Sequence, residues 1–226
     1  MKLLSNGLKR YSPEELKEML ASGQPLIFNS TDFFRMDLSN LDFSGASMAH
    51  CSFEQAFCQS TNFSETNLTG SNFCSCFMER ADFSGAVLVE VSFVNANLQN
   101  AVFSDSISYD ATFSSAEKVQ TNLSHCEFKN ALLNGADFSG ASCRDTDFSG
   151  ADLRNVSFKD CDVSYSNFWG AKCEKTNFDN CTTHGCKNIV QYDLLKLQHD
   201  QIRMQKERAD NFRPKDRYKN NQEIGD

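Results

Sequence analysis

The sequence predicts an all-β solenoid whose coils have four short sides and a filled interior. Three observations predict it: a large apolar residue recurs every five residues, a small residue stands two places before it, and Gly or Asn often stands two places after it. A period of five fits neither the helical period of about 3.6 residues nor the strand period of about two.

The large apolar position falls on residue numbers that end in 3 or 8. From Phe28 to Phe178 these 31 positions hold 16 Phe, 7 Leu, 3 Cys, 2 Met and 1 Val, and only Ser108 and Lys118 depart from the pattern. We therefore expect these side chains to fill the axis of the solenoid, in one strict phase throughout.

The positions two residues earlier hold small side chains. Between Thr31 and Thr176, only Met36 and Leu41 among them are not Ala, Ser, Thr, Cys or Val. Every Gly inside the array stands two residues after the large position, so a corner with positive φ is expected there. Four such sides close a coil of about 20 residues, and coils stack about 4.8 Å apart.

Several segments carry the resemblance to a known family. ADFSG at 81–85 and 136–140, TDFSG at 146–150 and ADLRN at 151–155 resemble the A(D/N)Lxx motif of the pentapeptide-repeat family. The resemblance covers residues 26–188 and implies a right-handed quadrilateral β-helix of about eight coils. The Phe-rich, Cys-containing core is similar to that of the topoisomerase-protecting, quinolone-resistance members. Those members also carry loops that interrupt the register, and strict phase predicts none here.

The ends of a solenoid expose core and unpaired strand edges, so both are expected to be covered. Residues 1–25 should hold a capping helix, with Ser12 as N-cap and Glu15 completing a capping box. Residues 26–188 should form the β-helix, and residues 189–226 a C-terminal helix and a charged flexible tail. That helix would either cover the end of one rod or join two copies as a homodimer, through Val190, Leu194, Leu195, Leu197 and Ile202.

Composition limits the partners. The formal net charge is −8, which disfavours direct nucleic-acid binding and leaves room for a basic partner. No apolar run reaches the length of about 18 residues that a membrane span needs. The N-terminus lacks the features of a signal peptide, so a cytoplasmic protein with reduced Cys is expected.

A filled interior offers no concave site, so no catalytic or cofactor-binding residue is assigned and the protein is not expected to be an enzyme. The sharpest alternative is a structural zinc site made of Cys161, Cys181, His184 and Cys186. Packing accounts for these Cys as well, because they fall on inward positions where a thiol behaves as a small hydrophobe. No metal ligand is therefore assigned.

Surface charge points to a protein partner. In strict phase, one side of the rod gathers six carboxylates against Arg144: Asp42, Glu65, Asp82, Asp105, Asp145 and Asp162. The sequence thus predicts a non-catalytic protein–protein interaction module that presents an acidic rod surface to a macromolecular partner. The family resemblance implies an alternative, a DNA mimic that binds a topoisomerase such as gyrase and protects it from inhibitors. A second alternative is a secreted effector acting in a host cell.

Apolar residues in outward positions are further candidates for partner binding. Two of them lie one coil apart and should stack, three cluster around the breaks in the pattern, and one is the single Trp; they are Phe57 and Phe77, Val89, Ile107 and Tyr109, and Trp169. At the breaks, Val119 is expected to replace Lys118 in the interior. Whether Ile107 or Tyr109 replaces Ser108 stays open.

Overall fold

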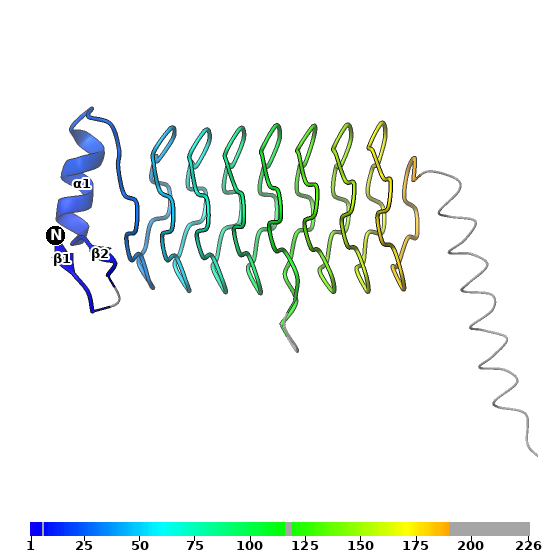
Figure 1. Cartoon of the computed structure of the whole chain (residues 1–226), viewed down its shortest axis with the longest axis horizontal. Coiled ribbons are helices and arrows are strands. Elements are labelled where there is room, and N and C mark those ends of the chain that lie inside the picture. Colours follow the sequence, from blue (N-terminus) through cyan, green and yellow to red (C-terminus); the bar gives the residue numbers. More distant parts are fainter. Residues whose placement is uncertain (6, 116–118, 190–226) are drawn as a thin grey trace, which may run out of the picture. The chain divides into compact units, whose positions relative to one another are not determined.

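A computed structural model describes residues 1–5, 7–115 and 119–189. Met1–Val190 form one compact unit, in which the chain winds into a stack of coils (Figure 1). Among the described residues, no helix combines the length and apolar character of a membrane span. The predicted C-terminal helix, and the dimer expected through it, lie outside the described residues: Val190, Leu194, Leu195, Leu197 and Ile202.

Two short strands and one helix precede the coils (Figure 1). Strands β1 (Lys2–Leu3) and β2 (Lys9–Arg10) pair antiparallel, and helix α1 spans Pro13–Ala21. The Ser12 hydroxyl accepts a hydrogen bond from the Glu15 amide at 3.2 Å, and the Glu15 carboxylate accepts one from the Ser12 amide at 2.9 Å. This is the capping box expected from the sequence, and it satisfies two amides that the helix cannot pair itself.

These elements attach to the first coil through both backbone and side chains. Lys9 in β2 forms a parallel bridge with Thr31. On α1, Leu16 is only 2% exposed, and the Tyr11 ring meets Phe28 edge to face at 5.7 Å. The first coil therefore has paired backbone and covered apolar surface on its N-terminal side, which an open edge would lack.

The coils pair in parallel, residue by residue. Asp32 bridges Ser52, Ser52 bridges Asn72, and the same spacing recurs on every side up to the bridge between Ser92 and Thr112. Between Ser30 and Gly185, every residue with positive φ has a number ending in 0 or 5. The predicted corner is thus confirmed, and it recurs even where the residue is neither Gly nor Asn, as at Arg80 and Tyr165.

Two continuous stacks of Phe rings fill the interior. Within each stack the rings are near parallel; between stacks they meet edge to face, as Phe93 and Phe103 do at 5.7 Å and 89°. Both arrangements suit the ring quadrupole and contribute about 0.5–1.5 kcal/mol per pair beyond burial. One stack runs through Phe33, Phe53, Phe73, Phe93, Phe113, Phe138, Phe158 and Phe178. The other runs through Phe43, Phe63, Phe83, Phe103, Phe128, Phe148 and Phe168.

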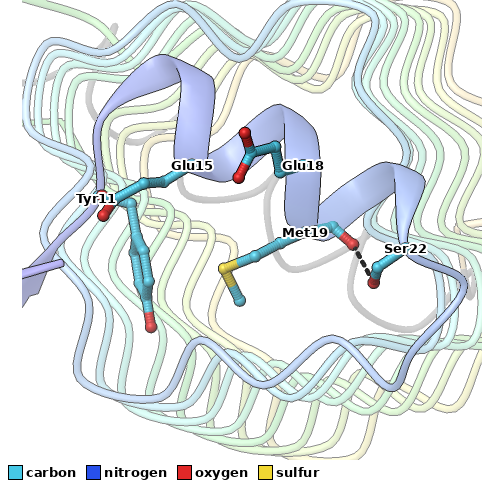
Figure 2. Close-up of a pocket in the computed structure, with 5 residues that line it drawn as sticks. All are labelled: Tyr11, Glu15, Glu18, Met19 and Ser22. Carbon is cyan, nitrogen blue, oxygen red and sulfur yellow. Dashed lines mark hydrogen bonds between the residues drawn. The ribbon is translucent and has the colours of Figure 1, made fainter.

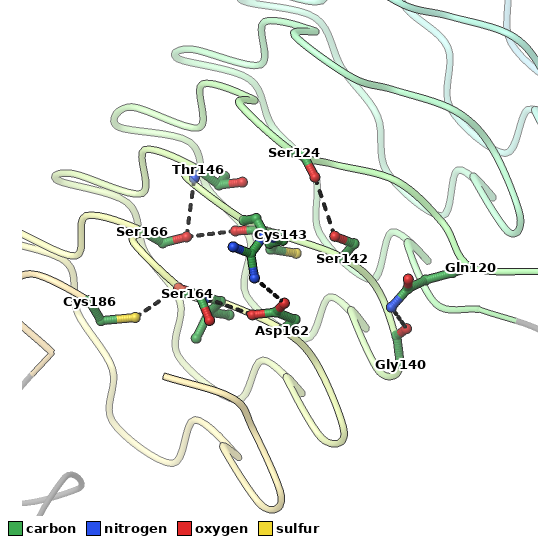
Figure 3. Close-up of polar contacts among 12 residues, drawn as sticks. Gln120, Ser124, Gly140, Ser142, Cys143, Thr146, Asp162, Ser164, Ser166 and Cys186 are labelled. Atoms are coloured by element: carbon green, nitrogen blue, oxygen red, sulfur yellow. Dashed lines mark hydrogen bonds and ion pairs between the residues drawn. The ribbon is translucent and has the colours of Figure 1, made fainter. Parts of the chain in front are cut away.

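Many of the small inward residues donate a hydrogen bond to a carbonyl of the coil before. Thr61 Oγ1 donates to the Leu38 carbonyl at 2.9 Å, and Cys76 Sγ donates to the Phe53 carbonyl at 2.6 Å, both across 23 residues. Figure 3 shows the same contact between Ser166 and Cys143, at 2.6 Å. Ser, Thr and Cys are therefore interchangeable here, because each fills little space and each donates to a buried carbonyl.

One coil is longer than the others, which corrects the expectation of strict phase. Asn97 bridges Asn122 and Ile107 bridges Leu132, whereas Asn122 bridges Ser142 at the regular spacing again. The coil between Ser115 and Thr121 is therefore five residues longer than its neighbours, and Figure 1 shows the green trace departing from the stack there.

Hydrogen bonds hold the residues at the two ends of the longer segment, next to Ser115 and Thr121. Ser115 Oγ and Gln120 Nε2 both donate to the Gly140 carbonyl at 3.0 Å (Figure 3 shows the Gln120 contact). Thr121 donates its amide to Ser115 Oγ at 2.8 Å. Val119 is 55% exposed, so the prediction that it enters the interior is wrong: the residues around it are additional to the coil.

Ser108, the second departure from the pattern, occupies a regular inward position. Ser108 is fully buried, and its Oγ lies 3.1 Å from Ser106 Oγ, which satisfies the hydroxyl. Tyr109 is 38% exposed and Ile107 is partly exposed. Neither replaces Ser108, because the serine pair closes that site by hydrogen bonding instead of apolar packing.

Candidate interaction faces

We define the acidic face as the side of the stack whose inward residues begin with Phe43 and end with Phe168. Along it, Asp42, Asn62 and Asp82 are bridged in sequence, and the row continues through Val102 to Glu127. Coils stack about 4.8 Å apart, and each coil from that of Asp42 to that of Asp147 adds one carboxylate to this side. The face carries six carboxylates and one lysine: Asp42, Glu65, Asp82, Asp105, Glu127, Asp147 and Lys129.

Asp145 and Asp162 do not belong to this face, contrary to the sequence prediction. Asp162 bridges Ser142, whose row leads back to Asn97 and Phe77 on the neighbouring side. The five extra residues displace every later side by a quarter of a coil. Asp145 also lies 3.1 Å from His125.

Asp162 in turn lies 2.8 Å from Arg144. The sequence reasoning missed Glu127 and Asp147, which occupy the places on the acidic face that it had given to Asp145 and Asp162. The sequence contains one signal of this displacement by a quarter of a coil. The Phe residues of the two ring stacks have residue numbers that end in 3 from Phe33 to Phe113 and in 8 from Phe128 onward.

The charge of the acidic face is concentrated in its first four coils. Lys129 Nζ lies 3.5 Å from Glu127 and 3.6 Å from Asp147, which partly neutralises the later coils. By contrast, within the described ranges none of the four earlier carboxylates has an ion-pair partner: Asp42, Glu65, Asp82 and Asp105.

Local hydrogen bonds orient two of the four earlier carboxylates, Asp42 and Asp82. Asp42 Oδ1 accepts from the Ser44 amide at 2.9 Å, and this bond holds the pKa of Asp42 below its usual value. Asp82 Oδ1 accepts from both the amide and the hydroxyl of Ser84. Such turns leave the second carboxylate oxygen available to a partner.

The exposed aromatic residues lie on two sides. Phe57 and Phe77, each 43% exposed, stack at 5.2 Å and 9°, which confirms the predicted ladder. Their row continues to Asn97 and so lies beside the acidic face. Trp169 is 68% exposed and follows Phe168, on the side of the acidic face, one coil before Lys187.

A second apolar group, which we call the apolar strip, lies on the other side adjoining the acidic face. Val87, Ile107 and Leu132 form one bridged row, and Val89 and Tyr109 stand two residues after the first two. Sequence reasoning named Val89, Ile107 and Tyr109 but missed Leu132, because in strict phase Glu127 would follow Ile107.

A hollow lies at helix α1. It has a volume of about 370 Å³, and Figure 2 shows the residues that line it: Tyr11, Glu15, Glu18, Met19 and Ser22. Glu15 already pairs with the terminal ammonium of Met1 and with the Ser12 amide. The Tyr11 ring and the Met19 side chain give the cavity an apolar wall (Figure 2). This set lacks a paired nucleophile and base, which nucleophilic catalysis requires.

The thiols near the C-terminal end of the stack are engaged in packing. Cys161 Sγ lies 3.5 Å from Cys143 Sγ, and Cys181 and Cys186 donate to the carbonyls of Phe158 and Val163 at 2.8 and 2.7 Å. Within the part of the chain that the structure describes, no group of three or more His, Cys, Asp or Glu is arranged to hold a metal ion.

Five-residue sides, positive-φ corners and a solid core define a pentapeptide-repeat β-helix. Sequence comparison agrees: the profile of the pentapeptide repeat region matches residues 88–168, and that of pentapeptide repeats in eight copies matches residues 31–70, 42–80 and 66–105. The chain belongs to the pentapeptide-repeat protein family.

Solved structures of the same fold are similar at low identity. HetL from the cyanobacterium Nostoc sp. strain PCC 7120, a pentapeptide repeat protein involved in heterocyst differentiation regulation, is 20% identical over 78% of this chain and 92% of its own, with a TM-score of 0.31. Trypsin-treated QnrB1, a plasmid-mediated fluoroquinolone resistance protein, is 18% identical over 78% and 96%, with a TM-score of 0.44.

A pentapeptide repeat protein of the Arabidopsis thaliana thylakoid lumen is 27% identical over 58% of this chain and 70% of its own, with a TM-score of 0.25. No curated protein sequence matches the chain. At these identities and scores, the solved structures say nothing about the partner of this protein.

Proposed function

We propose that this protein is a non-catalytic protein–protein interaction module whose acidic face binds a basic surface on a macromolecular partner. One observation carries the proposal: successive coils each place one carboxylate on the same face, and the first four have no ion pair within the described residues. Such a row attracts a positively charged partner and fixes its register more than it adds affinity.

The solid core supports this function by fixing the surface in space. The Phe rings of both stacks are almost fully buried, and a core packed this densely resists deformation. The outward carboxylates therefore need little ordering when a partner binds, which lowers the entropic cost of association. The proposal takes the solenoid as right-handed, about eight coils long and covered by a helix at each end, in a cytoplasmic protein.

Four conservative substitutions test the acidic face. We expect Asp42→Asn, Glu65→Gln, Asp82→Asn and Asp105→Asn together to abolish capture of the partner from a lysate of the source organism, and to weaken the purified complex in calorimetry. The amides keep the shape of each side chain, and Asn retains the turn hydrogen bond to the following amide.

A matched control removes the same charge from another side of the stack. Glu54→Gln, Asp137→Asn, Asp160→Asn and Asp179→Asn change carboxylates beside the stack that contains Phe53 and Phe178. This variant should retain the partner. Unchanged affinity in the acidic-face variant, or equal loss in both, would reject the proposal.

A second candidate is a DNA mimic that binds a topoisomerase and protects it from inhibitors. Two observations favour it: the evenly repeated carboxylates, and a coil interrupted between Ser115 and Thr121, as the resemblance to topoisomerase-protecting members implies. The imitation would be partial, with one charge per coil of about 4.8 Å where duplex DNA carries one per about 1.7 Å. No observation favours a secreted effector.

A gyrase supercoiling assay with and without quinolone separates the two candidates. Protection from the drug, or inhibition of supercoiling, is expected only for the topoisomerase-directed candidate. If active gyrase is neither protected from the drug nor inhibited, the topoisomerase-directed candidate is excluded. The interaction module then has another partner.

A further inference from the structure

The apolar strip consists of Val87, Val89, Ile107, Tyr109 and Leu132. Its central row depends on the long coil, since Ile107 is bridged on one side to Val87 and on the other, across the extra residues, to Leu132. Tyr109 is 38% exposed, and the other four side chains are partly exposed. On the coils before and after the strip, the same bridged row holds the polar residues Asn67 and Asp152. Five neighbouring apolar side chains on a protein surface indicate a binding surface.

Both long edges of the strip carry carboxylates. Asp105 and Asp110 are the corner residues on either side of Ile107, and Glu90 is the corner that follows Val89. Glu65 belongs to the coil before and leans towards the strip, because its Cγ lies 3.6 Å from where a Cβ on Gly85 would stand.

Asp110 leans in the same direction over the next coil. Its Oδ1 occupies the place that a Cβ on Gly135 would take, so its charge extends along the edge beside Leu132. Within the described ranges, Glu65, Glu90, Asp105 and Asp110 form no ion pair. The strip is thus apolar in the middle and negative along both edges.

The strip has a definite length. Leu132 bridges Asp152, whose two oxygens accept from Arg154 at 2.8 and 2.6 Å, so a neutral ion pair closes that end. At the other end of the strip, Val87 bridges the polar residue Asn67. Three rows at about 4.8 Å spacing span about 10 Å, close to two turns of an α-helix with a pitch of about 5.4 Å.

We infer that the apolar strip is a docking site for a cationic amphipathic helix of a protein partner. The helix lies along the solenoid axis, with apolar residues at i, i+3 or i+4, and i+7 over Val87, Ile107 and Leu132. Lysine or arginine residues on both flanks of that apolar row meet the carboxylates of the two edges. Charge complementarity selects this occupant, because a helix with acidic flanks would be repelled on both sides.

The inference rests on the proposed function, since it names one partner element of the interaction module. The strip adjoins the acidic face and shares Glu65 and Asp105 with it. A synthetic 14-residue helix with Leu at the three anchor positions and Lys on both flanks serves as the probe. Fluorescence anisotropy should show saturable binding that weakens as salt rises. The same peptide with Glu in place of Lys should not bind.

Variants assign the binding to the strip. Ile107→Thr with Leu132→Thr should weaken the Lys peptide about tenfold through lost apolar contact, and Glu90→Gln with Asp110→Asn should weaken it similarly and flatten its salt dependence. Phe57→Thr with Phe77→Thr is the control on another side and should leave the affinity unchanged. Thr suits strand positions, and a melting curve checks that each variant folds.

Three results would overturn the inference: no saturable binding of the Lys peptide, equal binding of the Glu peptide, or equal affinity in the strip variants. Asp42→Asn with Asp82→Asn separates it from the proposed function. If these substitutions alone remove the peptide, the acidic face is its site and the strip inference fails. If the peptide binds at the strip while the acidic-face variant keeps its natural partner, the proposed function fails instead.

Discussion

Phe113 stacks on Phe138, with ring centroids 4.6 Å apart and planes at 10°, although the whole of the long coil separates them in the sequence. The next rings in the same stack, Phe93 and Phe158, each lie only one regular coil away, from Phe113 and Phe138 respectively. The ring stack therefore stays continuous across the long coil. The core therefore fixes which surface residues share a face.

Removing residues 116–120 should leave the fold intact. The deletion joins Ser115 to Thr121 and preserves the order of large, small and corner positions, at the loss of the Gln120 hydrogen bond to Gly140. Shortening a surface loop changes closure entropy little, so the free energy of unfolding measured in urea should change by less than about 1 kcal/mol. Deleting residues 96–100, one complete side, is the control and should prevent cooperative folding.

Gly135→Ala should destabilise the protein more than Gly45→Ala. Both glycines have positive φ, which costs an alanine about 1–2 kcal/mol. Only at Gly135 would the new Cβ also meet the Asp110 carboxylate, whereas nothing lies within 4 Å of a Cβ at Gly45. Urea denaturation should show the difference, and adding Asp110→Ala should remove it. Equal costs in all backgrounds would contradict the described packing of Asp110.

Stability should fall at alkaline pH because buried thiols resist ionisation. Burial raises the pKa of Cys51 and of Cys76 to about 12 from the ordinary value of 9.0. A pKa that is higher in the folded state gives a contribution that is complete below pH 9 and is lost as the pH rises towards 12. Each thiol should cost up to about 1.4 kcal/mol per pH unit in that window.

Threonine substitution isolates this effect from the titration of Lys and Tyr. Thr61 and Thr66 fill the same inward position and donate to the same type of carbonyl. Cys51→Thr with Cys76→Thr should therefore match the parent protein at pH 7 and lose less free energy of unfolding between pH 9 and 10.5. Parallel curves for the two proteins would show that these thiols are not responsible.

The sequence predicts the parts of the fold that recur with a period of five. Phe, small and corner positions follow from local pattern, and so does the capping box at Ser12 and Glu15. An insertion of five residues preserves that period: Ala116 still falls on a small position, and Lys118 departs from the pattern just as the regular position Ser108 does, so neither residue reveals the insertion. Only the alternation of Phe with other core residues records it, since Phe occupies every second side of the coil.

That one insertion decides how much of the candidate surfaces could be predicted. Residues before it, such as Asp42, Glu65 and Phe57, lie on the sides that simple counting gives. Beyond it, counting assigns Asp145 and Asp162 to the wrong side and overlooks Glu127. The acidity of the face is retained because other carboxylates take those places.

The most direct test of the account is to determine which residue lies beside Ile107. Bridged neighbours in adjacent strands have Cα distances within the range of about 4.4–6.8 Å that a disulfide needs. We expect Ile107→Cys with Leu132→Cys to form a disulfide under mild oxidation, identified by peptide mass spectrometry, and Ile107→Cys with Glu127→Cys to remain reduced. Cross-linking at Glu127 and not at Leu132 would show coils of one regular length throughout, and would disprove the long coil, the apolar strip and the composition of the acidic face together.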